Sequence, residues 1–259
     1  MDNMIELIDV YKKLGDSQIL AGMDLAVQRG ETMVIIGRSG TGKSITLKHI
    51  VGLLEPDSGE VIVDGTDVAG ADRKTLLKLR SKMGVLFQSG ALIHWMSVRD
   101  NVALPLRELG GYTQRQVRAI VREKLDLVEL RGAGNLTPDK ISGGMKKRAA
   151  LARAISRDPE IILYDEPTAG LDPVIARSIN ELIVDLQKKL GVTSVVVTHD
   201  MRSAYHIGDR IAMLHKGRII QVGTPEQIRN TTDPVVRQFI EGESRGPLTD
   251  EAPRIAASG

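Results

Sequence analysis

Short apolar runs bounded by Gly, Asp or Pro recur along the chain, and this pattern is typical of β-strands. The runs at 33–36, 161–164 and 194–197 show no alternation of apolar and polar positions. Because a strand with one face in water alternates, these runs predict strands buried on both faces of a mostly parallel sheet. We expect strands within seven segments: 4–10, 31–37, 60–65, 82–88, 160–167, 193–200 and 209–217.

Hairpins and helices account for much of the remaining pattern. Residues 60–68 and 210–223 predict β-hairpins, because an Asp-Gly and a Lys-Gly pair interrupt their apolar runs. From about 98 to 155 the periodicity becomes helical, and the clearest helix is expected at 113–130.

The domain organisation follows from these patterns. We interpret residues 1–243 as one α/β domain with a helical insertion at about 89–156. The end of the chain, 244–259, contains Pro, Gly and Ser and few apolar residues. This composition predicts a tail that is either disordered or held by a partner.

Composition narrows the classes of function. Hydrophobic residues make up 42% of the chain and charged residues 26%, as in ordinary soluble globular proteins. The net charge of +2 is small and the basic residues are spread out, so we expect no nucleic-acid partner. The absence of cysteine excludes disulfides and thiolate metal sites. We expect no secretory signal and no membrane span, so that any membrane role requires a partner.

A glycine-rich segment follows the apolar run at 33–36 and has the spacing Gly37-x4-Gly42-Lys43-Ser44 of a phosphate-binding loop. Glycines let the backbone wrap phosphates and point its N–H groups at them. We expect Lys43 to direct its charge at the β- and γ-phosphates and the Ser44 hydroxyl to bind Mg²⁺. The candidate nucleotide-binding residues here are Gly37, Arg38, Ser39, Gly40, Thr41, Gly42, Lys43 and Ser44.

An acidic pair, Asp165 and Glu166, ends the apolar run at 161–164. Because α/β sheets bind ligands at the carboxyl ends of their strands, both side chains are expected beside the loop. We expect Asp165 to hold Mg²⁺ through water and Glu166 to polarise the attacking water as a general base. Alone, such a pair is more often a helix cap or a solvated turn, but the phosphate loop favours the catalytic interpretation.

Three single polar residues are further candidates. Gln88 ends the segment 82–88 and is expected to contact Mg²⁺ and the attacking water. His199 follows a strand and is expected to donate a hydrogen bond to the γ-phosphate, and Asp172 lies on a tight loop after Glu166. Each has an alternative, because polar residues at strand ends usually cap a helix or face solvent. For His199 taken alone, that alternative is the stronger one.

The segment 141–155, ISGGMKKRAALARAI, places Ser142, Gly143 and Gly144 directly before a helical run. Free backbone N–H groups and the partial positive charge of a helix start favour an anion. The chain therefore contains two expected phosphate-binding helix starts.

In order and spacing, these motifs resemble those of the ATP-binding-cassette (ABC) ATPases over about residues 4–240. The resemblance implies an α/β P-loop NTPase (RecA-like) fold with an antiparallel β-subdomain and a helical subdomain. It implies ATP and Mg²⁺ as cofactors and a head-to-tail dimer of two copies that sandwiches two ATP molecules. Ser142, Gly143 and Gly144 would then bind the γ-phosphate held by the other copy's loop, and Asp172 would belong to the nucleotide site.

Two positions depart from the family pattern. Met145 stands where the usual signature has glutamine, so a polar contact with the nucleotide is absent. Leu14 stands where an aromatic residue usually stacks on adenine, with Tyr11 three residues earlier. The residue that stacks on adenine is therefore not assigned.

Within the family, 86–108, the Ser-Gly-Gly-Met segment and 233–248 resemble the Mla-type ATPases of lipid transport systems that contain MCE-domain proteins. The resemblance implies that 86–108 receives the coupling helix of a membrane permease and that 233–248 reaches across to the partner ATPase. The sequence Ile-His-Trp at 93–95 departs from the Phe-Thr-Asp or similar of typical members. The expected docking residues, which would equally well pack the helical insertion, are Leu92, Ile93, Trp95 and Met96, with Arg99 nearby.

The leading hypothesis is the ATPase subunit of a lipid transporter, held by its permease at the cytoplasmic face of the inner (plasma) membrane. Its partners would be a second copy, the permease and an MCE-domain lipid-binding protein. Alternatives are the ATPase of an amino-acid-type or other small-solute importer, a non-transport ABC ATPase, and a small-molecule P-loop kinase. The kinase does not require the second helix start.

Overall fold

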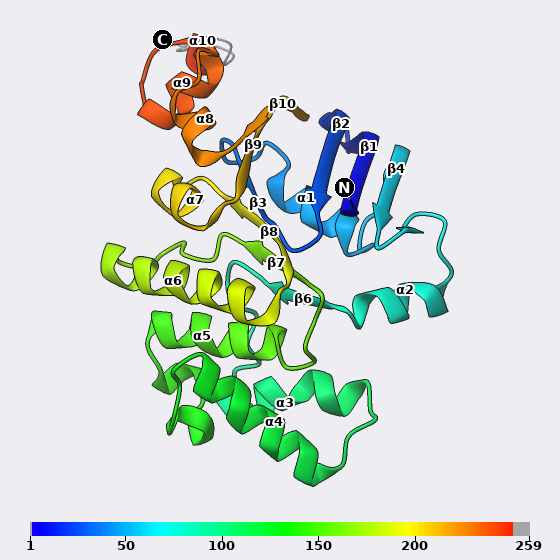
Figure 1. Cartoon of the computed structure of the whole chain (residues 1–259), viewed down its shortest axis with the longest axis vertical. Helices are drawn as coiled ribbons and strands as arrows, with labels where there is room; N and C mark the ends of the chain where they lie inside the picture. Colours follow the sequence, from blue (N-terminus) through cyan, green and yellow to red (C-terminus); the bar gives the residue numbers. More distant parts are fainter. Residues whose placement is uncertain (1, 251–259) are drawn as a thin grey trace, which may run out of the picture.

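Two β-sheets and a group of helices make up the described part of the chain, residues 2–250 of a computed structural model (Figure 1). The larger sheet has six strands in the order β10-β9-β3-β8-β7-β6, all parallel except β10, which is antiparallel to β9. Its strands are β3 (Thr32–Ile36), β6 (Met83–Leu86), β7 (Ile161–Asp165), β8 (Thr193–Thr198), β9 (Arg210–His215) and β10 (Arg218–Gly223).

The sequence correctly predicted a mostly parallel sheet that is buried on both faces. Every residue of β3 and β8 is buried. Both faces are covered because apolar side chains from successive positions of β3 point alternately to two separate cores. The parallel strands bring the residues that follow β3, β6, β7 and β8 to one edge of the sheet.

The smaller sheet is antiparallel, with the strand order β2-β1-β4-β5. Its strands are β1 (Asn3–Leu14), β2 (Ser17–Gln28), β4 (Ser58–Val63) and β5 (Thr66–Asp67). Both predicted hairpin turns are present, and Asp64, Gly65, Lys216 and Gly217 have the positive φ angles that two-residue turns require. The long strand β2 was not among the predicted strands. A register shift against β1 between Ala21 and Met23 interrupts its alternation, which is regular only over 23–28.

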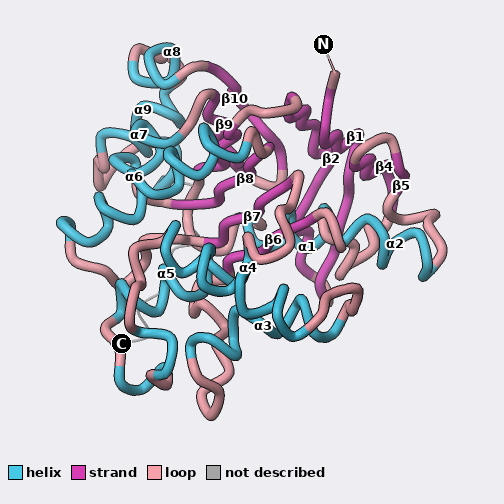
Figure 2. The backbone as a smooth tube through the Cα atoms, turned by 60° about the horizontal axis from the view of Figure 1, so that its bottom comes forward, coloured by secondary structure: helices cyan, strands magenta, loops and turns pink. Residues whose placement is uncertain are grey.

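Helices cover the sheets and form a separate group below them in Figure 1. The predicted helical region contains α3, α4 and α5, which contact one another and approach the sheet at β6 (Figure 2). The α-helices and 3-10 helices are α1 (Lys43–Ile50), α2 (Arg73–Arg80), α3 (Val98–Glu108), α4 (Gln114–Leu127), η1 (Ala133–Asn135), η2 (Pro138–Lys140), α5 (Gly143–Ala154), α6 (Pro173–Leu190), α7 (Met201–Ile207), α8 (Pro225–Arg229), α9 (Pro234–Glu241) and α10 (Pro247–Asp250).

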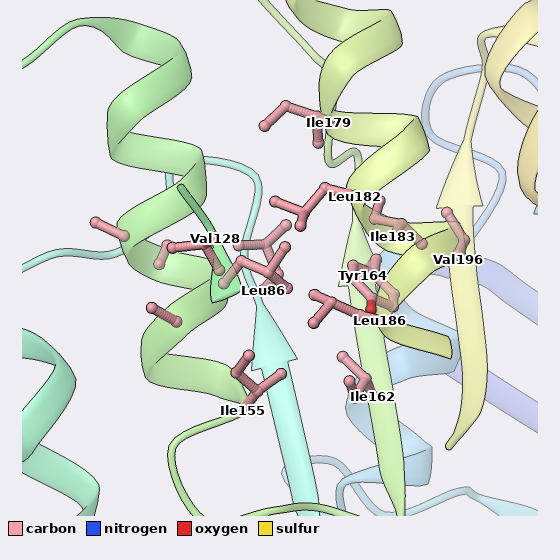
Figure 3. Packing of buried hydrophobic residues seen from close by; sticks show 14 of the residues in the cluster. Leu86, Val128, Ile155, Ile162, Tyr164, Ile179, Leu182, Ile183, Leu186 and Val196 are labelled. Carbon is pink, nitrogen blue, oxygen red and sulfur yellow. The ribbon is translucent and has the colours of Figure 1, made fainter. Parts of the chain in front are cut away.

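The sheet separates two hydrophobic cores. One core joins one face of the sheet to helices α3–α7, and Leu86, Tyr164 and Ile183 lie in it (Figure 3). The other joins the opposite face to the antiparallel sheet and α1, and it contains Ile35 and Leu163. Helices α1 and α5 therefore pack on opposite faces, which matters for the two expected phosphate sites.

The end of the described chain folds back on itself. Leu248 of α10 is 5% exposed, and its N–H donates to Gln238 Oε1 of α9 at 2.6 Å. This part of the expected tail is therefore packed on its own chain, where the Gln238 side chain accepts a hydrogen bond from the Leu248 backbone. Residues 251–259 lie outside the described residues. Within the described part, no helix is both long and apolar enough to cross a membrane.

Candidate functional site

The glycine-rich loop connects β3 to α1 at the carboxyl edge of the larger sheet. Gly37, Gly40 and Gly42 all have positive φ angles. A Cβ atom on Gly37 would lie 2.5 Å from the carbonyl oxygen of Leu214, so no other residue fits there without a shift of the backbone. The glycines of the motif therefore fix the path of the loop.

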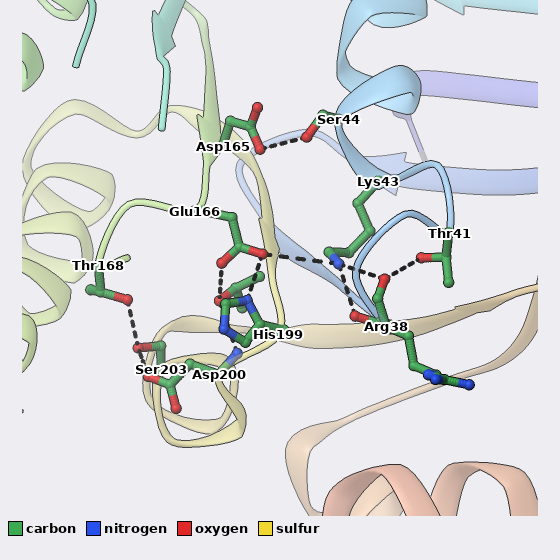
Figure 4. A network of polar contacts seen from close by, with 12 residues as sticks. Arg38, Thr41, Lys43, Ser44, Asp165, Glu166, Thr168, His199, Asp200 and Ser203 are labelled. Atoms are coloured by element: carbon green, nitrogen blue, oxygen red, sulfur yellow. Dashed lines mark hydrogen bonds and ion pairs between the residues drawn. The ribbon is translucent and has the colours of Figure 1, made fainter. Parts of the chain in front are cut away.

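Lys43 lies inside this loop and is 7% exposed. Its ammonium group donates to the carbonyl oxygens of Gly37 at 2.8 Å and Arg38 at 3.0 Å (Figure 4). Glu166 Oε1 lies 3.9 Å away. Burial lowers the pKa of Lys43, and the charges of Glu166 and Asp165 act in the opposite direction. A phosphate would be a stronger partner for this cation than the two carbonyl groups.

Ser44 and Asp165, two of the three predicted Mg²⁺ ligands, are in direct contact. Ser44 Oγ at the start of α1 donates to Asp165 Oδ1 at the end of β7, at 2.8 Å. These residues lie far apart in the sequence and meet because β3 and β7 both end at this edge. Figure 4 shows the pair beside the loop.

Glu166 is 8% exposed and is held by several neighbours. Thr198 Oγ1 donates to its Oε2 at 3.1 Å, and His199 Nδ1 lies 2.9 Å from its Oε1. Its backbone has a φ of +47°, which is uncommon for a residue other than glycine, and its N–H donates to the Val197 carbonyl. The carboxylate is thus oriented by two side chains from the end of β8 and the residue after it (Figure 4).

A cavity of about 360 Å³ brings half of the predicted site residues together. Gln88, Glu166 and His199 line it together with the loop. Leu14 and Ile19 supply apolar surface at the same cavity, whereas Tyr11 does not line it. The loop residues that line the cavity are Ser39, Gly40, Gly42, Lys43 and Ser44.

Other predicted residues point elsewhere. The Thr41 hydroxyl donates within the loop to the Arg38 carbonyl. The Arg38 guanidinium turns away from the cavity and donates to the Leu248 carbonyl of α10 at 2.6 Å. Asp172 accepts from the N–H groups of Val174 and Ile175 and so caps α6. Within its own chain, the contacts of Asp172 are therefore those of a helix cap, the alternative to a nucleotide-binding role.

The second expected phosphate site does not line this cavity. Ser142 caps α5, and its Oγ accepts from the Met145 N–H at 3.3 Å. A Cβ atom on Gly144 would lie 2.6 Å from Ile175 Cγ2, so the glycine allows α5 and α6 to approach each other closely. Met145 is half-buried against the core of helices, which is a place for an apolar side chain rather than glutamine.

Two residues that sequence reasoning missed contact the predicted site. Thr198 orients Glu166, and Lys147 of α5 donates to the carbonyl oxygens of Gln88 at 2.5 Å and Glu166 at 3.2 Å. Thr198 directly precedes His199, so its place at the end of β8 was a usable signal. Nothing in the helical pattern distinguishes Lys147 from the other basic residues of α5.

A second feature lies on the group of helices. Trp95 is 84% exposed on the loop before α3. A hollow of about 660 Å³ is lined mainly by α4 and residues 130–135, with Arg99 of α3, and includes four arginines and three large apolar side chains. Arg131 pairs with Asp126, but Arg99, Arg118 and Arg122 make no hydrogen bond or ion pair within residues 2–250. The apolar residues that line the hollow are Val121, Leu125 and Leu130.

Comparison with known proteins identifies several relatives. The profile of the family described as "ABC transporter" matches residues 20–169. The intermembrane phospholipid transport system ATP-binding protein MlaF of Haemophilus influenzae is 43% identical over 251 residues, covering 97% of this chain and 95% of that protein. The probable ribonucleotide transport ATP-binding protein mkl of Mycobacterium tuberculosis is 43% identical over 244 residues, covering 94% of this chain and 68% of that protein.

Solved structures share the fold. The ATP-binding cassette MJ0796, in a dimeric post-hydrolysis state bound to ADP and Pi, has a TM-score of 0.78 and 36% identity. The match covers 86% of this chain and 99% of that one. The structure of cbiO1 from Clostridium perfringens, part of the ABC transporter complex cbiONQ, has a TM-score of 0.82 and 29% identity. The match covers 92% of this chain and 94% of that one.

Proposed function

The chain belongs to the ABC transporter family, and on this premise we propose that it hydrolyses ATP to drive the transport of phospholipid or a related lipid between membranes. The observation that carries the ATPase assignment is the cavity where Lys43, Glu166, Gln88 and His199 meet. The observation that favours lipid is the match with MlaF, which spans nearly the whole of both proteins.

A second candidate function is the transport of a small solute. The mycobacterial relatives, equally similar in sequence, are named for probable ribonucleotide transport. That match covers 68% of the relative, so this chain corresponds more completely to MlaF in length. Length therefore favours the lipid transporter, and a direct transport assay decides between the two.

ATP would bind with its phosphates inside the glycine-rich loop. The backbone N–H groups and the start of α1 favour the negative charge, and Lys43 would exchange its carbonyl partners for the β- and γ-phosphates. Leu14 and Ile19 would provide the apolar surface for adenine. The loop's own contacts thus hold Lys43 close to where the phosphates would lie.

The oxygen groups beside the loop suit Mg²⁺. This ion prefers one or two carboxylate or hydroxyl ligands together with phosphate and water oxygens. Ser44 Oγ and Asp165 Oδ1 are 2.8 Å apart, and Gln88 lines the same cavity. Residues 2–250 contain no group of three or more His, Cys, Asp or Glu side chains that would bind a metal alone. When bound, Mg²⁺ would neutralise charge on the phosphates.

Glu166 would accept a proton from the attacking water. Thr198 and His199 keep its two carboxylate oxygens in place, so the side chain needs little rearrangement. A neutral His199 that donates from Nδ1 to Glu166 has no hydrogen on Nε2. Donation to the γ-phosphate therefore requires either the imidazolium form or release of Glu166.

The family membership and the dimeric cassette structures support a head-to-tail dimer of this chain. Helices α1 and α5 pack on opposite faces of the larger sheet, and Ser142, Gly143 and Gly144 do not line their own chain's cavity. In the proposed dimer, they would bind the γ-phosphate held by the second copy. Bringing the halves together would exclude water and strengthen every charge interaction there.

We assign the contact with the permease to the surface around Trp95. An exposed tryptophan four residues before Arg99, which lines the cationic hollow, fits an apolar helix flanked by acidic residues. This contact would hold the chain at the cytoplasmic face of the inner (plasma) membrane, with an MCE-domain protein in the same system.

Two measurements test the proposal. The tagged full chain, isolated from detergent-treated membranes, should carry a permease with several membrane spans; recovery with ribosomes or DNA instead would refute a transport role. The recovered complex is then placed in vesicles and supplied with ATP. We expect a fluorescent phospholipid to move to acceptor vesicles, whereas uptake of a labelled ribonucleotide without lipid movement would support the second candidate.

A further inference from the structure

Helix α5 is tied to two parts of its own chain's catalytic cavity by one buried lysine. Lys147 is 6% exposed, and its ammonium group donates to the carbonyl oxygens of Gln88 and Glu166 at 2.5 and 3.2 Å. No carboxylate within residues 2–250 lies close enough to form an ion pair with it. Backbone carbonyls are therefore its direct partners, with Asp165 and Glu166 contributing charge nearby.

A second cation of α5 extends this connection. Arg153 donates to the carbonyl oxygens of Gly90 and Ala91 at 2.8 and 2.6 Å. Both acceptor residues have positive φ angles, which is costly for Ala91 unless contacts hold it there. The loop that starts at Gln88 thus runs along α5 and is fixed by side chains one to three turns into the helix.

The same helix begins at Ser142, Gly143 and Gly144, which complete the second copy's ATP site in the proposed function. Lys147 lies about one turn, or ~6 Å, beyond that helix start. One rigid helix therefore connects the second copy's phosphate to Gln88 and Glu166 of the first.

We propose that Lys147 is a positioning residue that couples the two ATP sites: it fixes the Gln88 and Glu166 backbones of one site to the helix that completes the other. The inference rests on the ATP-sandwich dimer of the proposed function. Binding of the γ-phosphate at the start of α5 moves the helix, and the Lys147 ammonium passes that movement to the two carbonyl groups. Lys147 itself touches neither ATP nor the attacking water.

The position of the Glu166 side chain depends on its backbone, which is held by three hydrogen bonds. Its N–H donates to Val197, and its carbonyl accepts from Lys147 and from the Ala169 N–H at 3.2 Å. Loss of the Lys147 contact leaves Lys43 and the loop unchanged, so ATP affinity should persist. A base displaced by about 1 Å loses up to roughly 100-fold in rate.

The test compares three variants of the full chain. Lys147→Met nearly keeps the length of the side chain but removes the donors, and Lys147→Gln supplies amide donors on a shorter side chain. Lys146→Met is the matched control, because the Lys146 side chain makes no hydrogen bond or ion pair within residues 2–250. Each is measured for equilibrium ATP binding and for turnover against ATP concentration.

For Lys147→Met we expect kcat to fall by about 100-fold, ATP affinity to stay within about twofold, and the Hill coefficient to fall from above 1 to about 1. Lys147→Gln should recover part of kcat, and Lys146→Met should match the wild type. Binding of ATP with unchanged affinity also reports that a variant is folded. If Lys147→Met does not fold, the split between kcat and affinity in Lys147→Gln decides.

Three outcomes overturn the inference. Wild-type kcat in Lys147→Met excludes a positioning role, and parallel loss of affinity and kcat in both Lys147 variants assigns Lys147 to structure alone. A wild-type Hill coefficient of 1 removes the coupling. If the wild type hydrolyses ATP and Lys43→Ala does not, these results leave the proposed function intact. A wild type without any turnover refutes the proposed function itself.

Discussion

Hydrogen bonds hold each reactive side chain of the site, and for Ser44 and Glu166 the partner comes from a distant part of the sequence. Lys43 is held by loop carbonyls, Ser44 by Asp165, and Glu166 by Thr198. Burying polar groups is costly unless they are hydrogen-bonded, so these contacts fix side chains that would otherwise destabilise the fold. The same contacts place the Lys43 ammonium and the Glu166 carboxylate 3.9 Å apart in one cavity.

Replacement of Lys43 tests the role of that cation. Lys43→Ala should lower ATP turnover by about 100-fold or more, because the phosphates lose a buried charge partner. Lys48→Ala, on the exposed face of the same helix α1, is the control and should keep wild-type turnover. Turnover is measured by phosphate release, and equal activity in the two variants would contradict the loop assignment.

Replacement of Glu166 separates binding from chemistry. Glu166→Gln keeps the size and the hydrogen bond from Thr198 but removes the base, so ATP should bind while turnover falls by about 1000-fold. An ATP-bound dimer should accumulate and be visible by light scattering. Glu181→Gln, at an exposed pair with Arg177, is the control. A monomeric variant with normal turnover would disprove the base assignment.

At the scale of the elements, most correct predictions came from apolar runs and from the spacing of glycines. The parallel strands and the phosphate loop were found because burial on both faces and a tight turn leave direct signals in the sequence. Strand β2 was missed although 23–28 alternates, because the shift between Ala21 and Met23 breaks the pattern across the whole strand. Lys147 was missed because its role arises from tertiary contacts with Gln88 and Glu166, which follow β6 and β7, and no helical periodicity records such contacts.

The loop before α3 presents the clearest test of the permease contact. Trp95→Ala should abolish recovery of the permease while leaving ATP turnover of the isolated chain unchanged, because Trp95 is exposed and lies outside the cavity. Tyr112→Ala, at another exposed aromatic residue of this group of helices, is the control. Co-purification from membranes measures the effect, and full recovery of the permease with Trp95→Ala would place the contact elsewhere.

At the scale of the whole molecule, the two expected phosphate-binding helix starts belong to helices on opposite faces of the larger sheet. Helix α1 begins at its own chain's cavity, whereas α5 packs on the other face of the sheet and begins outside that cavity. A single copy therefore contains two half sites rather than two whole ones. In the proposed dimer, catalysis would require both copies, and a defect in one half site should be rescued by an intact half on the other copy.

Mixing two inactive variants tests this requirement. Lys43→Ala removes the loop's cation, and Ser142→Arg places a large side chain at the start of α5. Each homodimer has two defective sites, but a mixed dimer has one site with both halves intact. If the intact site works without ATP at the defective one, turnover should return to at most about half of the wild-type rate per mixed dimer, whereas the coupling through Lys147 predicts a lower rate. Sedimentation with increasing ATP identifies the mixed dimer.

A mixed dimer that forms but shows no turnover would mean that both sites must be intact, whereas failure to form it would contradict the composite site.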